Sequence, residues 1–327
     1  MTPHLIDTLF DSFRRQKIAV IGDVMLDKYI FGHVSRISPE YPVPVVDVTH
    51  EDSRLGGAAN VALNIHALGA ETFLIGVTGH DQSREAMTAL MHEQGLEAGL
   101  LLADPSRPTT CKTRILSQNH HITRVDYESR QPLDAATEEK LLGIFSEIAG
   151  SLGAVVLEDY NKGVLTGSFI ASVIGICRNL GVPVLVDPKL KGFFSFQGCS
   201  VFKPNLSELA ASLGIVLHNT DQEVEEGCLL LKERLHADSF VVTRSEKGMT
   251  IYDGSFTHIP ATSLDVADVS GAGDTVIGML ALGTAAGLDL VTSTRIANLA
   301  AGTVCQEVGA VPVRPERLLR VCHDHLQ

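Results

Sequence analysis

Short apolar runs rich in Val and Ile recur along the chain, and longer stretches with apolar residues at every third or fourth position separate them. The short runs predict buried strands, and the longer stretches predict amphipathic or small-residue helices. The predicted strands span 17–21, 72–77, 154–157, 182–186 and 240–243. The predicted helices span 57–68, 83–94, 137–149, 167–180, 222–235, 274–286 and 290–308. Because strands alternate with helices, we expect an α/β fold with a doubly wound, mostly parallel sheet covered on both faces.

Two segments break this alternation. Residues 33–50 contain three prolines followed by alternating valines, and residues 108–127 have the pattern of two strands around Ser117-Gln118-Asn119. They predict a small β layer inserted into a single domain that spans 1–327. The layer would be either a lid over a substrate or an edge that pairs with another subunit, and the pattern favours neither.

The composition fits a packed globular protein and narrows its partners. Of the 327 residues, 45% are hydrophobic and 20% are charged, which argues against disorder. The formal net charge of −13 repels nucleic acids and acidic membranes, so we expect neither as a partner. The six cysteines form no C-x-x-C pair, no signal peptide is recognisable, and no apolar stretch reaches the ~20 residues of a membrane span. We therefore expect reduced thiols and a cytoplasmic protein.

The segment 268–275 precedes a small-residue helix and is the first candidate for chemistry. Gly271, Ala272 and Gly273 leave backbone N–H groups uncovered at a helix N-terminus, where the free donors and the helix dipole favour a phosphate. Asp274 would lie in the first turn and could accept the proton of an attacking hydroxyl. A tight turn with Asp274 as a plain helix cap explains the segment equally well. P-loop, dinucleotide and protein-kinase motifs are missing, so a phosphotransferase here needs another design.

Two upstream groups are candidates for ligand binding. Gly56 and Gly57 permit close approach of a ligand, and Asn60 could hydrogen-bond a polyol. Asp23 and Asp27 follow the first predicted strand, at the edge where open sheets bind ligands, and a carboxylate there could accept two sugar hydroxyls. Helix-start packing and turn chemistry are the structural alternatives for these residues.

Three separated motifs resemble those of the ribokinase-like (PfkB) carbohydrate kinases over nearly the whole chain. They are Gly-Gly-Ala-Ala-Asn-Val-Ala at 56–62, Asn-x-x-Glu at 205–208 and Asp-x-x-Gly-Ala-Gly-Asp at 268–274. The blocks at 22–27, 35–40, 42–46 and 202–208 are similar to those of the heptose 7-phosphate kinases of lipopolysaccharide core synthesis. This resemblance implies transfer of a phosphoryl group from ATP to the 1-hydroxyl of D-glycero-β-D-manno-heptose 7-phosphate, giving the 1,7-bisphosphate.

The resemblance also implies a role for each matching residue. Asp274 would be the base, with Gly271, Ala272 and Gly273 as the anion hole. The sugar would contact Asp27, Gly56, Gly57, Asn60 and Asp187. ATP would lie against Asn205, Glu208, Thr243, Arg244 and Asn298, with Mg²⁺ held by Asn205 and Glu208 through water. A monovalent cation would lie near Asp268, although Val269 and Ser270 stand where many family members have threonines.

A substrate that already carries a phosphate needs cations at the far end of its pocket. The candidates are Lys112, Arg114, Arg124, Lys189 and Lys191, of which we favour Lys112, Arg124 and Lys191. Each of these could instead be a solvated surface charge.

The resemblance further implies a homodimer formed through the β lid and a separate adenylyltransferase that acts next in the pathway. Two alternatives stay open: a kinase for another sugar or sugar phosphate, and a non-catalytic sugar or nucleotide sensor. A dehydrogenase is disfavoured because the dinucleotide fingerprint is missing.

Overall fold

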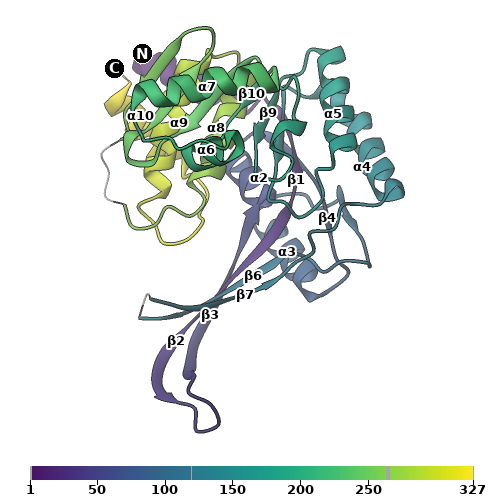
Figure 1. Cartoon of the computed structure of the whole chain (residues 1–327), viewed down its shortest axis with the longest axis vertical. Helices are drawn as coiled ribbons and strands as arrows, with labels where there is room; N and C mark the ends of the chain where they lie inside the picture. Colours follow the sequence, from purple (N-terminus) through teal and green to yellow (C-terminus); the bar gives the residue numbers. More distant parts are fainter. Residues whose placement is uncertain (1, 119, 263–265, 327) are drawn as a thin grey trace.

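A nine-stranded sheet forms the body of the protein (Figure 1). The computed structural model describes residues 2–118, 120–262 and 266–326. The strand order is β13-β12-β11-β10-β9-β8-β1-β4-β5, parallel from β11 to β5 and antiparallel at β12 and β13. The strands are β1 (Lys17–Gly22), β4 (Glu71–Thr78), β5 (Leu101–Ala103), β8 (Ala154–Glu158), β9 (Val184–Asp187), β10 (Val201–Phe202), β11 (Ser239–Thr243), β12 (Met249–Tyr252) and β13 (Phe256–Ile259). The predicted α/β class with a mostly parallel sheet is confirmed.

Helices cover both faces of this sheet, as the alternation predicts. One core contains side chains from α1 (Pro3–Phe13), α2 (Ala58–Ala67), α3 (Gln82–Glu93), α8 (Ala272–Ala285), α9 (Leu290–Val304) and α10 (Pro315–His325). The other core contains side chains from α4 (Ala135–Ile148), α5 (Gly167–Leu180), α6 (Leu206–Leu213) and α7 (Asp221–Leu235). Short 3-10 turns are η1 (Ala149–Ser151), η2 (Phe193–Ser195) and η3 (Ser245–Lys247).

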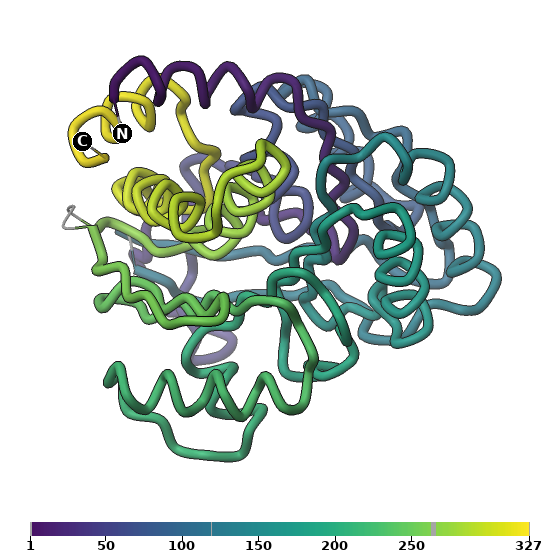
Figure 2. The backbone as a smooth tube through the Cα atoms, turned by 90° about the horizontal axis from the view of Figure 1, so that it is seen from above, coloured from purple at the N-terminus to yellow at the C-terminus, as the bar shows by residue number. Residues whose placement is uncertain are grey.

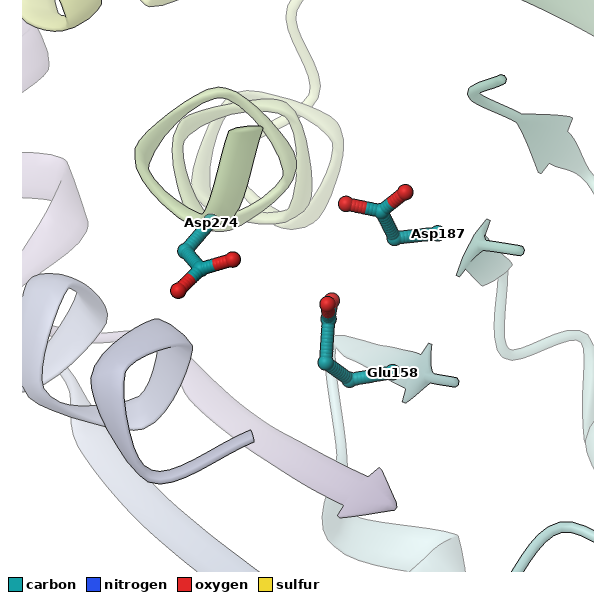
Figure 3. A group of neighbouring side chains, drawn as sticks. All are labelled: Glu158, Asp187 and Asp274. Carbon is teal, nitrogen blue, oxygen red and sulfur yellow. The ribbon is translucent and has the colours of Figure 1, made fainter. Parts of the chain in front are cut away.

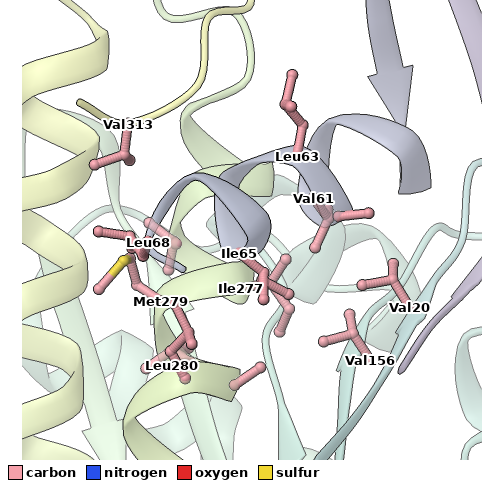
Figure 4. Close-up of a cluster of buried hydrophobic side chains, with 14 of the residues drawn as sticks. Val20, Val61, Leu63, Ile65, Leu68, Val156, Ile277, Met279, Leu280 and Val313 are labelled. Carbon is pink, nitrogen blue, oxygen red and sulfur yellow. The ribbon is translucent and has the colours of Figure 1, made fainter. Parts of the chain in front are cut away.

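Successive side chains of β1 point alternately into the two hydrophobic cores. Ile18 and Val20 belong to one core and Ala19 and Ile21 to the other, and all four are fully buried. A central strand with two buried faces is therefore apolar at every position, which is why its sequence is a continuous apolar run. Each buried Ile or Val contributes about 1.5–3 kcal/mol. Figure 4 shows Val20 beside α2 and α8 side chains in the first of these cores.

A second, four-stranded sheet of order β3-β2-β6-β7 projects from the body (Figure 1). Its strands are β2 (Val24–Ile37), β3 (Pro44–Gly57), β6 (Cys111–Ser117) and β7 (His120–Tyr127). The first hairpin is longer than the predicted 33–50, because only Asp23 separates the end of β1 from the start of β2. Asp27 therefore lies inside a lid strand and not in a turn after β1. The strand pair expected in 108–127 is present, while Asn119 lies outside the described residues.

The first and last helices, α1 and α10, lie side by side (Figure 2). The His323 Nε2 is 2.9 Å from the Asp7 Oδ1, which joins α10 to α1. The helix predicted at 290–308 ends four residues early, at Val304, and the helix expected from Asp274 begins at Ala272. All six cysteines are free and buried. No helix in the described ranges has the length and apolar character needed to cross a membrane.

Candidate active site

The glycine-rich segment forms the N-terminus of α8. Gly271 is its N-cap residue with φ of 77°, a left-handed conformation that favours glycine. A Cβ atom at Gly271 would also lie 2.9 Å from the Asn60 Nδ2, so the close approach of α2 requires a glycine there. The Ala272 N–H donates to the Val269 carbonyl at 3.2 Å. The positive end of the helix dipole at this terminus of α8 creates a site that attracts an anion.

Asp274 lies in the first turn of α8 and is only 5% exposed. Its Oδ2 accepts a hydrogen bond of 2.7 Å from the Asn60 Nδ2, and its Oδ1 accepts one of 2.8 Å from the Tyr160 hydroxyl. Burial raises the pKa of Asp274 to about 6, although these two hydrogen bonds oppose the rise. The carboxylate is thus ionised at neutral pH and is a stronger base than an exposed aspartate.

Two further carboxylates converge on Asp274 (Figure 3). Glu158 ends β8 and Asp187 ends β9, and one oxygen of each of the three acids lies within 4.8 Å of the others. Glu158 is fully buried, and neither of its oxygens has a hydrogen-bond partner within the described ranges. Burial, followed by the charges of Asp187 and Asp274, raises the pKa of Glu158. Hard oxygen donors with one unsatisfied carboxylate fit a divalent cation such as Mg²⁺.

A cavity of about 610 Å³ opens beside the glycine-rich turn. It brings together four residues predicted for the anion hole and the nucleotide: Thr243, Ala272, Gly273 and Asn298. The other lining residues are Ser245, Glu246, Gly248, Met249, Ala261, Thr262, Val266, Val269, Val276, Ala301, Gly302 and Cys305. Its mostly apolar wall beside an anion site suits a nucleotide base and its phosphates.

Arg244, which we expected near the nucleotide, is not among the residues that line this cavity, although its neighbours Thr243 and Ser245 are. Its side chain is buried and takes part in a polar network. The guanidinium donates to the Asp221 Oδ1 at 2.6 Å and to the Asn219 Oδ1 at 2.8 Å. It also donates to the Thr250 hydroxyl at 2.9 Å. Arg244 therefore fastens the turn after β11 that forms one wall of the cavity.

Asn205 and Glu208 form a capping box at the start of α6. Asn205 accepts a hydrogen bond from the backbone of Glu208, and Glu208 accepts one from the backbone of Asn205. The second oxygen of Glu208 pairs with the Lys189 Nζ at 2.9 Å. The structure thus gives the expected metal-associated pair a helix-capping function, while the three clustered carboxylates lie elsewhere.

Residues predicted to bind the sugar occupy the junction of lid and body. Asp27 is 7% exposed, and its Oδ1 accepts a hydrogen bond from the Arg114 guanidinium at 2.6 Å. A Cβ at Gly56 would lie 2.5 Å from the Asp27 Oδ2, so this glycine makes room for the carboxylate. Gly57 has φ of 57° and caps α2. Asn60 is 1% exposed and contacts Asp274, a partner the sequence analysis did not predict.

Asp23 has a structural role, in place of the predicted contact with sugar hydroxyls. It is 1% exposed and accepts hydrogen bonds from the backbone N–H groups of Tyr160, Lys162 and Val164. Burial nevertheless raises its pKa, against the lowering effect of these bonds. Asp23 thereby fixes the segment that carries Tyr160 toward the base.

The cations are distributed differently from the prediction. The Lys112 Nζ lies 5.2 Å from the centre of the Tyr160 ring, and the Lys189 Nζ lies 4.9 Å from it. Arg124 pairs with Asp126 on the exposed strand β7, and Lys191 is exposed. Of the two lysines that follow Asp187, Lys189 therefore lies beside Tyr160, and Lys191 stays a prediction as a phosphate ligand.

Sequence analysis assigned no function to Glu158, Tyr160 and Lys203. The first two follow a predicted buried strand, and Lys203 follows β10, so all three lie at the carboxyl edge where open α/β sheets bind ligands. That rule, applied to every strand, would have identified Glu158 and Tyr160. Lys203 follows a strand of two residues, which is too short for its pattern to be recognised.

Comparisons with solved structures give the fold. Escherichia coli phosphofructokinase-2, solved in complex with substrates and products, superposes with a TM-score of 0.80, at 16% identity over 95% of this chain and 100% of that one. Arabidopsis thaliana ribokinase, complexed with ribose and ATP, superposes with a TM-score of 0.74, at 18% identity over 94% of this chain and 98% of that one.

Curated relatives share more sequence. The bifunctional protein HldE of Pelobacter propionicus is 39% identical over 316 residues, 96% of this chain and 64% of that protein. HldE of Rhodospirillum rubrum is 40% identical over 325 residues, 99% of this chain and 65% of that protein. The chain therefore spans just under two thirds of the length of these relatives.

Fold and relatives together define a carbohydrate kinase. More narrowly, the chain belongs to the pfkB family of carbohydrate kinases, whose sequence pattern matches residues 15–317. The sensor and dehydrogenase alternatives are thereby set aside.

Proposed function

We propose that the chain transfers the γ-phosphoryl group of ATP to the anomeric hydroxyl of D-glycero-β-D-manno-heptose 7-phosphate, giving the 1,7-bisphosphate for ADP-heptose and lipopolysaccharide core synthesis. The similarity to HldE and the four sequence blocks shared with heptose 7-phosphate kinases support this substrate. The observation that carries the chemistry is the buried Asp274 carboxylate beside the glycine-rich N-terminus of α8.

In this proposal Asp274 takes the proton of the attacking hydroxyl, and the N–H groups at Gly271, Ala272 and Gly273 hold the phosphoryl oxygens. Asn60 and Tyr160 keep the base oriented through one hydrogen bond to each oxygen. Preorganised donors of this kind stabilise charge as it develops in the transition state. The nucleotide occupies the cavity beside Thr243 and Asn298.

Mg²⁺ is proposed as the cation that accompanies ATP. Glu158 and Asp187 offer oxygen ligands close to the base, and the unsatisfied oxygens of Glu158 supply the strongest reason for a cation there. Bound Mg²⁺ would neutralise charge on the phosphate groups. Asn205 and Glu208 stay proposed as its outer, water-mediated partners. A monovalent cation near Asp268 also stays proposed, although both oxygens of Asp268 already accept hydrogen bonds from Ser270 and Gly309.

The charged face of the lid supports a substrate that bears a second phosphate. Lys112 and Arg114 alternate along β6 and so point to the same face, and register places Arg124 of β7 opposite Arg114. Burial lowers the pKa of Lys112, and the nearby Asp27 carboxylate opposes that change. A half-buried cation above the sugar site is suited to a phosphate group.

The lid is also the proposed dimer interface. Exposed apolar side chains gather on its strands and turn, among them Ile37, Tyr41, Val43, Val48 and Tyr127. Apolar groups on strand edges favour pairing with a second copy. A cytoplasmic location stays part of the proposal, because the substrate and ATP would be supplied there.

A substrate panel tests the proposal. ADP release in the presence of Mg²⁺ and ATP is measured with β-heptose 7-phosphate, its α anomer, heptose without phosphate and fructose 6-phosphate. We expect the β-heptose 7-phosphate to give the highest kcat/KM, at least tenfold above the others. Preference for fructose 6-phosphate would favour the alternative of a kinase for another sugar phosphate and contradict the heptose assignment.

A further inference from the structure

Lys203 is a buried cation that none of the roles above uses. It follows β10 directly, and its backbone N–H donates to the Val186 carbonyl of β9. Its Nζ lies 2.8 Å from the Asp187 Oδ2, and the two side chains are 3% and 5% exposed. Apolar residues of similar volume often replace buried ion pairs without loss of stability, so stability alone does not explain this pair.

The pair faces the N-terminus of α8. A Cβ atom at Gly273 would lie 3.7 Å from the Lys203 Nζ and 3.7 Å from the Asp187 Oδ2. Gly273 is the second residue of α8 and lines the nucleotide cavity. A buried positive charge and the N-terminus of a helix therefore converge on one point.

The hydrogen-bond donors of Lys203 indicate the kind of ligand that would bind beside Gly273. An ammonium group has three N–H donors, and Asp187 is the single side chain with which Lys203 pairs among the described residues. The remaining donors suit a group with several acceptor oxygens and more than one negative charge. A phosphoryl group in transfer has this character, because its charge spreads over three oxygens.

We propose that Lys203 is a catalytic residue whose ammonium group contacts the phosphoryl group during its transfer, while Asp187 holds the ammonium in place. This inference rests on the phosphoryl transfer proposed above. The bond from the γ-phosphorus to the β–γ bridging oxygen breaks and a bond to the acceptor oxygen forms. The hydroxyl proton passes to Asp274 and ADP leaves, while Lys203 keeps its proton and supplies charge only.

Nucleotide binding tests this role without a sugar. Calorimetry with Mg²⁺ compares ADP with AMP-PNP, an analogue that carries a γ-phosphate group. We expect Lys203→Met to weaken AMP-PNP binding about tenfold or more, since a hydrogen bond to a charged group contributes about 1.5–3 kcal/mol, and to leave ADP binding within about threefold. Lys203→Arg should restore much of the preference, and kcat of Lys203→Met should fall about 10²-fold.

Controls separate this effect from misfolding. Lys140→Met removes an exposed lysine of α4 and should change neither affinity. Because Lys203→Met leaves Asp187 buried and unpaired, a double variant with Asp187→Asn removes both charges and is checked by circular dichroism. A folded Lys203→Met or double variant with the wild-type ratio of ADP to AMP-PNP affinity would overturn the inference. A wild-type chain that prefers AMP-PNP through Lys203 and yet phosphorylates no sugar phosphate would contradict the proposed substrate alone.

Discussion

The Asn60 Nδ2 donates a 2.7 Å hydrogen bond to the Asp274 Oδ2, across 214 positions of sequence. This bond joins the two glycine-rich motifs, because α2 and α8 pack against each other and bring both helix starts to one edge of the sheet. Asn60 therefore orients the base and favours its ionised form. The two motifs are parts of one site rather than two independent ligand contacts.

The hydrogen bond from the Tyr160 hydroxyl to Asp274 can be tested by the pH dependence of kcat/KM. Tyr160→Phe removes a hydrogen bond that lowers the pKa of Asp274, so that pKa should rise above its present value of about 6. Since Asp274 must be ionised to act as a base, the acidic limb of kcat/KM should move upward by about one pH unit. The pH dependence of kcat/KM is measured for wild type and variant. Tyr127→Phe, on the exposed strand β7, is the matched control, and an unmoved limb in Tyr160→Phe would refute this coupling.

Replacing the buried Glu158 should stabilise the protein, whereas most substitutions of buried residues destabilise it. Its folded pKa is raised, so the folded state retains the proton as pH rises above the unfolded value, and stability falls across that range. Glu158→Gln should increase the free energy of unfolding at pH 8 by about 1–3 kcal/mol, with little difference at pH 4. Urea unfolding without Mg²⁺ measures this difference, and the exposed Glu147→Gln is the control. Destabilisation at pH 8 would be the contrary result.

The same variant also tests the cation. Mg²⁺ that binds the folded wild type should raise its Tm, by more the tighter it binds, and removal by EDTA should reverse the rise. Glu158→Gln should show a smaller rise because one ligand has lost its charge. An equal rise in both proteins would place the cation elsewhere.

A substitution at Arg244 should weaken ATP binding indirectly, through the turn that forms one wall of the cavity. Arg244→Lys cannot keep all the hydrogen bonds to Asn219, Asp221 and Thr250, so the turn after β11 should loosen. We expect KM for ATP to rise about tenfold, kcat to stay within about threefold, and the free energy of unfolding to fall by about 2 kcal/mol. Steady-state kinetics and urea unfolding check this, with the exposed Arg295→Lys as control. A large fall in kcat at unchanged KM would instead indicate contact with the reacting group.

Variants of Lys112 and Lys191 test which of these lysines binds the phosphate group that the sugar already carries. Lys112→Met should raise KM for the sugar phosphate about 10-fold to 100-fold, because Lys112 lies beside Tyr160. Lys191→Met should leave KM unchanged, because Lys191 is exposed. The reversed pattern would restore Lys191 as the phosphate ligand.

Some of these elements and contacts can be predicted from the sequence, and others cannot. Apolar runs identify central strands such as β1, because burial on both faces leaves a continuous signal. The two-residue strand β10 gives no such signal, and so Lys203 was missed. The sequence also cannot predict where a side chain points. It places Arg244 after β11, but its hydrogen bond to Asp221 depends on tertiary packing. For the same reason, the sequence alone does not show that Lys189 lies beside Tyr160 while Lys191 is exposed.

The most direct test of the central claim is the effect of Asp274→Asn on single-turnover phosphoryl transfer and on ATP binding. The variant keeps the size of the side chain but removes the base. We predict that the rate falls about 10³-fold while the Kd for ATP stays within about threefold. A folded Asp274→Asn variant that transfers the phosphoryl group within tenfold of the wild-type rate would contradict the assignment of Asp274 as the base.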